Sequence, residues 1–158
     1  IIKENHLDPY VILHGRQAGQ MLDLLFELCD FGIGSLGRHR SGITNIKTLK
    51  NREYAARGIP FIYSEIDEDF ENMPYIMKIP ANEEAVDIKQ ILNFYNQLHI
   101  TPLEIRNSIR HLSWNNQMKK VLDEMQKKDK INPNNNNIAN FATLYTNKFI
   151  PNKEKWPH

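Results

Sequence analysis

The chain has 158 residues, a length that suits one domain with a substantial hydrophobic core. Lys and Arg number 20 against 19 Asp and Glu, so the formal net charge of +1 creates no overall field that would attract nucleic acid or an anionic membrane. The single cysteine, Cys29, excludes an intrachain disulfide, and no apolar run approaches the roughly 18 residues of a membrane span. These features predict a soluble, cytoplasmic protein.

Short apolar runs and an amphipathic segment alternate at the start of the chain. Residues 10–15 (YVILHG) form an apolar run that ends in glycine, as a buried parallel strand does. Residues 17–30 carry apolar side chains at three- and four-residue spacings, which predicts a helix with one buried face. Residues 31–36 (FGIGSL) predict the next strand.

A stretch rich in glycine and basic residues leads to the next helix and strand. The pattern predicts a helix over 46–57 that ends before Gly58, followed by a strand over 60–64. A shorter strand is predicted over 75–80, after the acidic turn EIDEDFEN. Glu71 lies in that turn and is expected to tolerate substitution.

Two amphipathic helices are predicted in the second half, over 83–98 and 101–128. The second opens with Thr101 as a cap, Pro102 at the first helical position and Glu104 at the third. Strands and helices that alternate at this pace predict an α/β fold, a Rossmann-like parallel sheet with flanking helices.

The domain organisation is predicted from composition. Residues 1–130 are expected to form the α/β domain, and the Asn-rich run NPNNNN opens a linker and tail over 131–158. A doubly wound domain usually begins with a strand and a helix that are absent before residue 10. The chain is therefore expected to be the second half of a larger enzyme.

The loop that begins at Gly34 is a candidate anion site. It follows a predicted parallel strand, at the end of the sheet where ligands bind, and its glycines let backbone amides approach an anion closely. The first turn of the following helix adds unpaired N–H groups. The basic residues available nearby are Arg38, Arg40, Lys47 and Lys50. The spacing matches neither the dinucleotide fingerprint nor the P-loop, so the loop alone is a weak signal.

Three segments in order resemble a known enzyme family. TLKNREYAARGIPFIYS (48–64) resembles the signature helix and strand of retaining GT-B glycosyltransferases of the group 1 (GT4-like) type, where a Leu-Lys-x-x-Glu-Tyr-x-x-x-Gly-x-Pro-x-Ile pattern is typical. CDFGIGSLGRHRSG (29–42) is similar to the preceding strand and loop of one bacterial branch, and LSWNNQMKKVLDEM (112–125) is similar to the helix that closes the domain. The resemblance covers about residues 10–126 and implies the C-terminal, donor-binding half of such an enzyme.

The resemblance also implies roles for individual residues. Glu53 matches the second glutamate of the family's Glu, seven residues, Glu motif, whose carboxylate accepts hydrogen bonds from ribose hydroxyls. Residues 46–50, which include Thr48, Leu49 and Lys50, match the helix start whose amides meet the diphosphate, and Lys50 matches the motif lysine, with a catalytic role. The loop residues implied at the sugar and phosphate are Ser35, Leu36, Gly37, Arg38 and His39.

Some assignments stay open. Asn45 occupies the catalytic position of the first motif glutamate, so either it makes neutral hydrogen bonds near the donor sugar or the match around it is shifted. His39 is either a phosphate or sugar contact or a general base. Glu53 is flanked by Lys50 and Arg57, and an ion-paired helix surface is its alternative role.

The implied function is transfer of a sugar, with retention at the anomeric carbon, from a nucleoside diphosphate sugar to a glycan or lipid-linked acceptor in bacterial surface polysaccharide synthesis. No metal is expected, because the histidines lack metal-ligand spacing, and the fragment is expected to be inactive without its N-terminal acceptor domain. Peripheral association of the full-length protein with the inner face of the membrane is left open. The alternatives are a catalytically inactive nucleotide-binding or interaction domain of the same fold, which Asn45 favours, and half of a dinucleotide-dependent dehydrogenase, against which the missing fingerprint argues.

Overall fold

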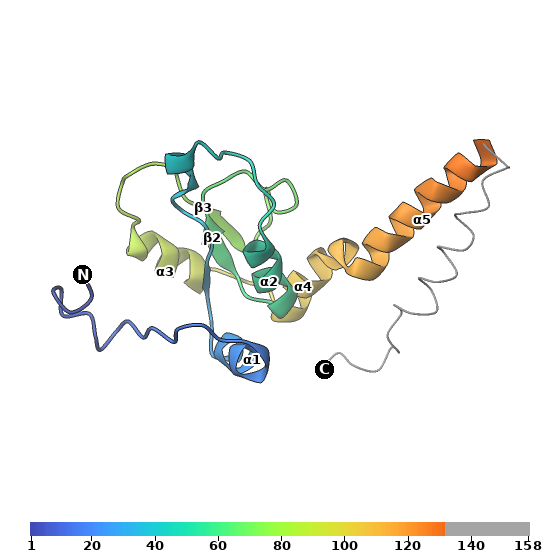
Figure 1. Cartoon of the computed structure of the whole chain (residues 1–158). Helices are drawn as coiled ribbons and strands as arrows, with labels where there is room; N and C mark the ends of the chain where they lie inside the picture. The colour runs from blue at the N-terminus through green and yellow to red at the C-terminus, as the bar shows by residue number, and fades with distance from the viewer. Residues whose placement is uncertain (132–158) are drawn as a thin grey trace. The chain divides into compact units, whose positions relative to one another are not determined.

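The computed structural model describes residues 1–131, with side chains up to residue 127. The chain divides into two compact units, Ile1–Ile105 and a second that begins at Arg106 (Figure 1). The first unit contains a parallel sheet with flanking helices, which confirms the predicted α/β class. Both units include residues of the predicted 1–130 domain, and residues 132–158 of the predicted tail lie outside the described residues.

The sheet has the strand order β1-β2-β3, and both strand pairs are parallel. The strands are β1 (Gly32–Ile33), β2 (Phe61–Tyr63) and β3 (Ile76–Lys78). The helices of the described chain are α1 (Gly19–Glu27), α2 (Leu49–Arg57), α3 (Ile88–Asn96), α4 (Pro102–Ser108) and α5 (Trp114–Ile131), with 3-10 turns η1 (Arg38–Ser41) and η2 (Arg110–Leu112). Gly32 pairs with Phe61, and Phe61 with Ile76, so β2 is the central strand.

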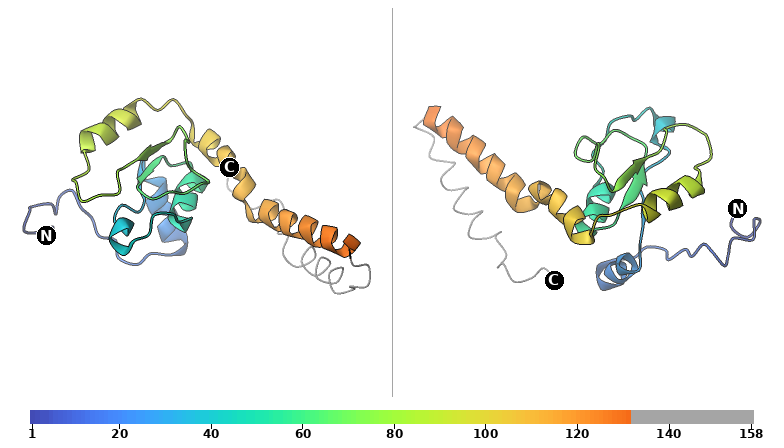
Figure 2. Two further views of the ribbon diagram at one scale, coloured as in Figure 1. Left: turned by 90° about the horizontal axis from the view of Figure 1, so that it is seen from above. Right: turned by 180° about the vertical axis from the view of Figure 1, so that it is seen from behind.

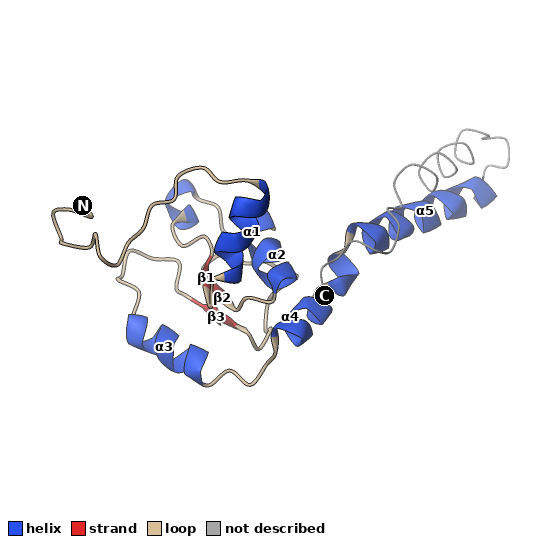
Figure 3. Ribbon diagram, turned by 90° about the horizontal axis from the view of Figure 1, so that it is seen from below, coloured by secondary structure: helices blue, strands red, loops and turns tan. Residues whose placement is uncertain are grey.

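The core is built around β2, whose three residues are all buried. On one side, Tyr54 of α2 packs against Phe61 with ring centroids 5.6 Å apart, and against Phe26 of α1 at 6.0 Å. Phe31, next to β1, makes edge contacts with Phe94 and Tyr95 of α3 at 6.3 and 5.9 Å. Figure 2 shows the strands between these helices, and Figure 3 shows α2 and α3 on opposite sides of the sheet. Aromatic packing therefore holds the layers together.

The predicted strand over 10–15 is wrong. These residues form no strand, and Tyr10, Ile12 and Leu13 are 84%, 72% and 79% exposed. Gly15 has a φ of +65°, a left-handed conformation that interrupts an extended run. An apolar run needs a neighbouring strand for its backbone hydrogen bonds, and in the described chain β1 pairs only with β2.

The helix predicted from residue 46 begins three residues later, at Leu49. The backbone N–H of Ile46 donates to the carbonyl oxygen of Ile66 at 3.0 Å, and the N–H of Ile66 donates to Thr44 at 2.8 Å. These bonds hold residues 44–46 in an extended bridge, so the helix can begin only after Thr48.

The predicted helix over 101–128 is interrupted. Its start is confirmed as a capping box, because Glu104 Oε2 accepts from the Thr101 backbone N–H at 2.7 Å and Thr101 Oγ1 accepts from the Glu104 N–H at 3.2 Å. Ser113 has an extended conformation with ψ of 147°, and its carbonyl oxygen accepts from the N–H of Gln117 at 2.9 Å. Ser113 therefore ends one helical segment and begins α5.

Gly58 ends α2 in the left-handed conformation, with φ of +78°. A Cβ atom here would lie 2.6 Å from the carbonyl oxygen of Pro102. Both the backbone conformation and the close approach to α4 therefore require glycine at this position.

Within the described residues, no helix is long and apolar enough to cross a membrane.

Candidate functional site

The carboxyl ends of the three strands lie at one edge of the sheet, because all strand pairs are parallel. Residues 34–42 leave the sheet after β1, and residues 64–75 leave it after β2. The N–H of Ser64 donates to the carbonyl oxygen of Ser35 at 3.0 Å, so these two segments begin side by side. Ligands of open α/β sheets bind at this edge, which makes it the candidate site.

Gly34 brings the end of β1 against the first turn of α2. A Cβ atom on Gly34 would lie 2.8 Å from the carbonyl oxygen of Ile62 and 3.0 Å from Oδ1 of Asn51. A larger residue would have to displace the backbone of β2 or the side chain of Asn51. The glycine loop and the helix start are therefore neighbours, and their role in holding a ligand stays a prediction.

The helix start carries the residues that the resemblance assigns to the diphosphate. Thr48 is the N-cap, and its Oγ1 accepts from the N–H of Asn51 at 3.3 Å. The N–H groups of Leu49 and Lys50 belong to the first turn and have no intrahelical acceptor. Leu49 is 83% exposed and Lys50 is also exposed, and no hydrogen bond of the Lys50 side chain is found within residues 1–127. This end of α2 carries a partial positive charge that favours an anion.

The loop after β1 is tied down by its basic residues. Arg38 Nε donates to Ser35 Oγ at 2.9 Å, while His39 Nε2 lies 2.8 Å from Glu83 Oε1. Arg40 binds both carboxylate oxygens of Glu83. Hydrogen bonds from Arg40 and then from His39 lower the pKa of Glu83 to about 2. His39 and Arg40 are thus occupied by Glu83, whereas Arg38 keeps a side chain that is 41% exposed.

Leu36 and Gly37 lie between these contacts. Leu36 is half-buried, and a Cβ atom on Gly37 would meet no atom within 4 Å. The structure therefore does not require glycine at position 37 for packing.

Glu53 has a partner on its own helix. Its Oε1 accepts from Arg57 Nε at 2.6 Å, and Arg57 Nη2 also donates to Asp23 of α1 at 2.6 Å. Glu53 is 47% exposed, and no contact in the described chain joins it to Ser35 or Arg38. The structure brings Glu53 into an ion pair, which is the alternative role considered from the sequence.

Asn45, at the position of the first motif glutamate, is exposed. It forms the isolated parallel bridge with Ile66, in the segment that follows β2. Asn45 therefore lies beside the 64–75 segment and is separated from α2 by Ile46, Lys47 and Thr48.

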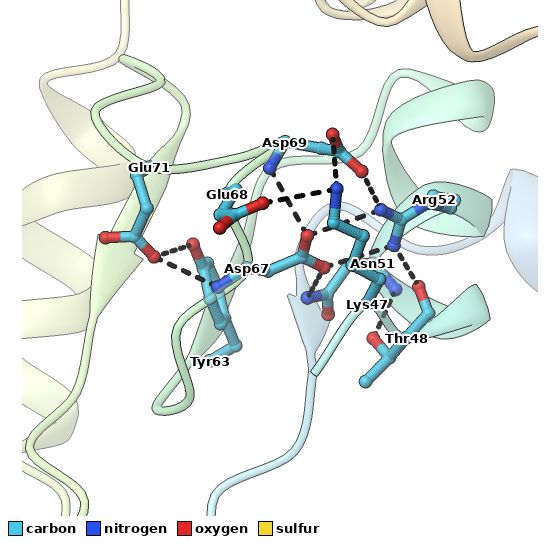
Figure 4. A network of polar contacts seen from close by, with 9 residues as sticks. All are labelled: Lys47, Thr48, Asn51, Arg52, Tyr63, Asp67, Glu68, Asp69 and Glu71. Atoms are coloured by element: carbon cyan, nitrogen blue, oxygen red, sulfur yellow. Dashed lines mark hydrogen bonds and ion pairs between the residues drawn. The ribbon is translucent and has the colours of Figure 1, made fainter. Parts of the chain in front are cut away.

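Sequence reasoning missed a polar network that joins α2 to the segment after β2 (Figure 4). Asp67 is fully buried and accepts hydrogen bonds from Asn51 Nδ2 at 3.2 Å and from Arg52 Nη1 at 3.1 Å. Arg52 also binds Asp69, and Lys47 lies 3.3 Å from Asp69 Oδ1. Burial alone would raise the pKa of Asp69, but Arg52 and Lys47 outweigh burial, and the pKa is lowered. The signal in the sequence was the cluster of acidic residues directly after a buried strand.

Glu71 belongs to the same network, and its contacts argue against the expectation that it tolerates substitution. Its Oε1 accepts from Tyr63 Oη at 2.9 Å, from the Asp67 N–H at 3.2 Å and from Lys78 Nζ at 2.9 Å. Burial and the neighbouring Glu71 carboxylate raise the pKa of Tyr63 above its usual value. Glu71 therefore connects β2, β3 and the segment between them.

Glu65 is a further acidic residue that sequence reasoning missed. It follows β2 by two positions and is 3% exposed. Arg38 Nε lies 3.9 Å from its Oε1, too far for a hydrogen bond. The candidate edge thus combines a buried carboxylate, an accessible guanidinium and a helix N-terminus, which suits a ligand that carries both hydroxyl groups and a negative charge.

Among the described residues, no group of three or more His, Cys, Asp or Glu side chains could hold a metal ion.

Comparison of the chain with protein-family models, with curated proteins and with solved structures finds no match.

Proposed function

We propose that the chain is the donor-binding part of a retaining glycosyltransferase of the GT-B fold, and that it binds a nucleoside diphosphate sugar. The observation that carries the proposal is the contact of Gly34 with the first turn of α2, which brings the loop after β1 next to a helix N-terminus. This arrangement at the carboxyl edge of a parallel sheet suits a diphosphate. The motifs over 29–42 and 48–64 supply the second line of support.

In this proposal the cationic groups stabilise the negative charge of the diphosphate as it leaves. The N–H groups of Leu49 and Lys50 and the ammonium of Lys50 contact the phosphates, and Arg38 approaches them from the loop after β1. Charge stabilisation by fixed dipoles and cations is a large contribution to catalysis of this kind. Asn45 offers a neutral amide near the sugar.

Glu53 binds the ribose hydroxyls in the proposed complex. The ion pair with Arg57 is compatible with this role, because Arg57 also contacts Asp23 and can keep that partner when Glu53 turns to a ligand. The acceptor is a glycan or a lipid-linked sugar, and the remaining catalytic contacts come from an acceptor domain. We place the reaction in the cytoplasm, at the inner face of the membrane when the acceptor is lipid-linked.

An inactive nucleotide-binding or interaction domain of the same fold is the second candidate. Two observations favour it: Asn45 replaces a carboxylate of the motif, and the Glu53 carboxylate is already paired with Arg57. Such a domain would bind a nucleoside diphosphate without transferring a sugar.

The test is calorimetric titration of the wild type and of Glu53→Gln with UDP, GDP, ADP and NAD. We expect one of the nucleoside diphosphates to bind, and Glu53→Gln to weaken that binding by about 1.5 to 3 kcal/mol, roughly ten- to a hundredfold, because a charged acceptor of two hydroxyls is lost. The free energy of unfolding should change by less than about 0.5 kcal/mol, since Glu53 is 47% exposed and Arg57 keeps Asp23 as a partner.

Asp23→Asn is the matched control, because Asp23 is an exposed carboxylate that binds the same arginine. It should leave nucleotide affinity unchanged. If Glu53→Gln and Asp23→Asn bind the nucleotide equally well, Glu53 is only an ion-pair partner and the donor-site assignment fails. Preferential binding of NAD would favour a dehydrogenase instead.

A further inference from the structure

Glu65 is a buried carboxylate with no hydrogen-bond partner on either oxygen within the described part of the chain. Its side chain is 2% exposed. A carboxylate accepts hydrogen bonds and, when ionised, donates none, so its needs can be met only by N–H or O–H groups. Buried charged groups in proteins are normally paired, and an exception at a ligand-binding edge calls for an explanation.

The neighbouring cations do not meet this need. Arg38 Nε is 3.9 Å from Glu65 Oε1 and donates instead to Ser35 Oγ. Lys78 Nζ donates to the backbone carbonyl of Glu65 and to the carboxylate of Glu71. Neither cation donates a hydrogen bond to the Glu65 carboxylate.

Other unpaired polar atoms lie at the same edge of the sheet. In the described residues, the buried side-chain atoms without a partner are Nδ1 of His39, Oδ1 of Asn51 and the two oxygens of Glu65. His39 follows β1, Asn51 lies against Gly34 in the first turn of α2, and Glu65 follows β2. Unpaired groups concentrated at the carboxyl ends of parallel strands indicate a site arranged for a ligand rather than a general defect of packing.

We propose that Glu65 and Arg38 form a subsite for a sugar phosphate, in which Glu65 accepts hydrogen bonds from sugar hydroxyls and Arg38 binds the phosphate. The separation of 3.9 Å leaves the guanidinium and the carboxylate close enough to contact adjacent groups of one ligand. The Arg38 side chain is 41% exposed, and its terminal nitrogens make no hydrogen bond within residues 1–127. The inference rests on the proposed function, since the subsite would hold the sugar and the adjoining phosphate of the donor.

The test is an NMR titration of the protein with four probes at millimolar concentrations. The probes are glucose 1-phosphate, galactose 1-phosphate, mannose 1-phosphate and inorganic phosphate. Glu65→Gln should weaken binding of the preferred hexose phosphate by about tenfold or more and leave binding of inorganic phosphate nearly unchanged. Arg38→Gln should weaken both. Glu68→Gln is the matched control, because Glu68 lies three residues further along the same segment and is 67% exposed.

The melting temperature separates a binding role from a structural one. Because the Glu65 carboxylate accepts no hydrogen bond from the described residues and its ion pair with Arg38 is long, at 3.9 Å, Glu65→Gln should melt at the same temperature as the wild type or higher. A lower melting temperature, failure of the variant to fold, or unchanged affinity for every hexose phosphate would overturn the proposal.

Titration of the wild type with UDP and GDP separates this inference from the proposed function. If a nucleotide binds but Glu65→Gln has no effect on hexose phosphates, the subsite is wrong and the donor-binding function stands. If hexose phosphates bind through Glu65 but no nucleotide binds, the subsite stands and the proposed function fails. If the wild type binds none of the probes, both are overturned.

Discussion

Replacing Asp67 with alanine should destabilise the α/β unit by about 3 kcal/mol. Asp67 is fully buried, and its carboxylate accepts from Asn51 Nδ2 and from both terminal nitrogens of Arg52. The change leaves these donors without their acceptor (Figure 4). Because Arg52 and Asn51 belong to α2, the loss also detaches the helix from the segment that follows β2.

The magnitude follows from what each donor loses. Removing one partner of a buried ion pair costs about 3 to 5 kcal/mol, but Arg52 is 21% exposed and keeps Asp69 as a partner, so the lower end applies. Asn51 is 1% exposed, but the space that alanine leaves in place of the carboxylate admits a water molecule that can accept the Asn51 hydrogen bond, so Asn51 adds little to this cost. We therefore expect a total near 3 kcal/mol, and a fall in melting temperature of roughly 10 °C or more.

The assay is urea unfolding followed by circular dichroism, with a double-mutant cycle of Asp67→Ala and Arg52→Met. The two residues should be coupled by about 1 kcal/mol or more, because they share two hydrogen bonds. Glu68→Ala is the control. Glu68 is 67% exposed and lies 3.4 Å from Lys47, so its removal should cost less than about 0.5 kcal/mol.

Equal unfolding free energies for Asp67→Ala and Glu68→Ala would refute this reasoning. The same conclusion would follow from a coupling energy near zero between Asp67 and Arg52. Asp67→Asn keeps an acceptor and the side-chain volume, so it should fold even if the alanine variant does not, with an intermediate loss of stability.

Two further predictions concern the backbone and the pH dependence. Gly58→Ala should destabilise the unit by about 1 to 3 kcal/mol, because φ is +78° and the new Cβ atom would collide with Pro102. Gly37→Ala is the control and should have little effect, because its Cβ atom would meet open space. Similar urea midpoints for the two variants would contradict this prediction. Because the pKa of Tyr63 is raised in the folded state, the folded protein keeps the phenol proton at a pH where the unfolded chain has lost it. The contribution of Tyr63 to the free energy of unfolding is therefore complete below about pH 10 and falls by about 1.4 kcal/mol per pH unit above it. Urea unfolding from about pH 8 to about pH 11 should give a shallower decline for Tyr63→Phe, and identical slopes would argue against the shift.

Local signals were sufficient for most of the elements. The apolar spacing over 17–30 and 83–98 predicts the helices α1 and α3, since helical periodicity is a local signal. The buried face expected for the first of them is wrong: α1 has no buried residue, and Met21 and Leu24 are 56% and 53% exposed. Thr101, Pro102 and Glu104 predict the start of α4, since a capping box is made within four consecutive residues. The α/β class follows from the order of these elements along the chain.

The sequence predicts less well the segments whose conformation depends on distant partners. Residues 10–15 have the composition of a strand but no partner strand in the described chain, and composition cannot supply one. Residues 44–46 look helical in sequence, but backbone hydrogen bonds to Ile66, about twenty residues away, hold them extended. In both places a long-range pairing, or its absence, overrides local preference.

The sequence by itself determined which chemical groups follow each strand: a glycine and arginine loop after β1, and an acidic segment after β2. Only the tertiary structure decided what those groups do. Asp67 and Glu65 lie two residues apart, yet Asp67 accepts hydrogen bonds from Asn51 and Arg52, while no donor within the described residues reaches the carboxylate of Glu65. The difference arises because hydrogen bonding depends on the position and direction of atoms from other elements, and the fold brings α2 to Asp67 but leaves Glu65 beside Arg38 at 3.9 Å.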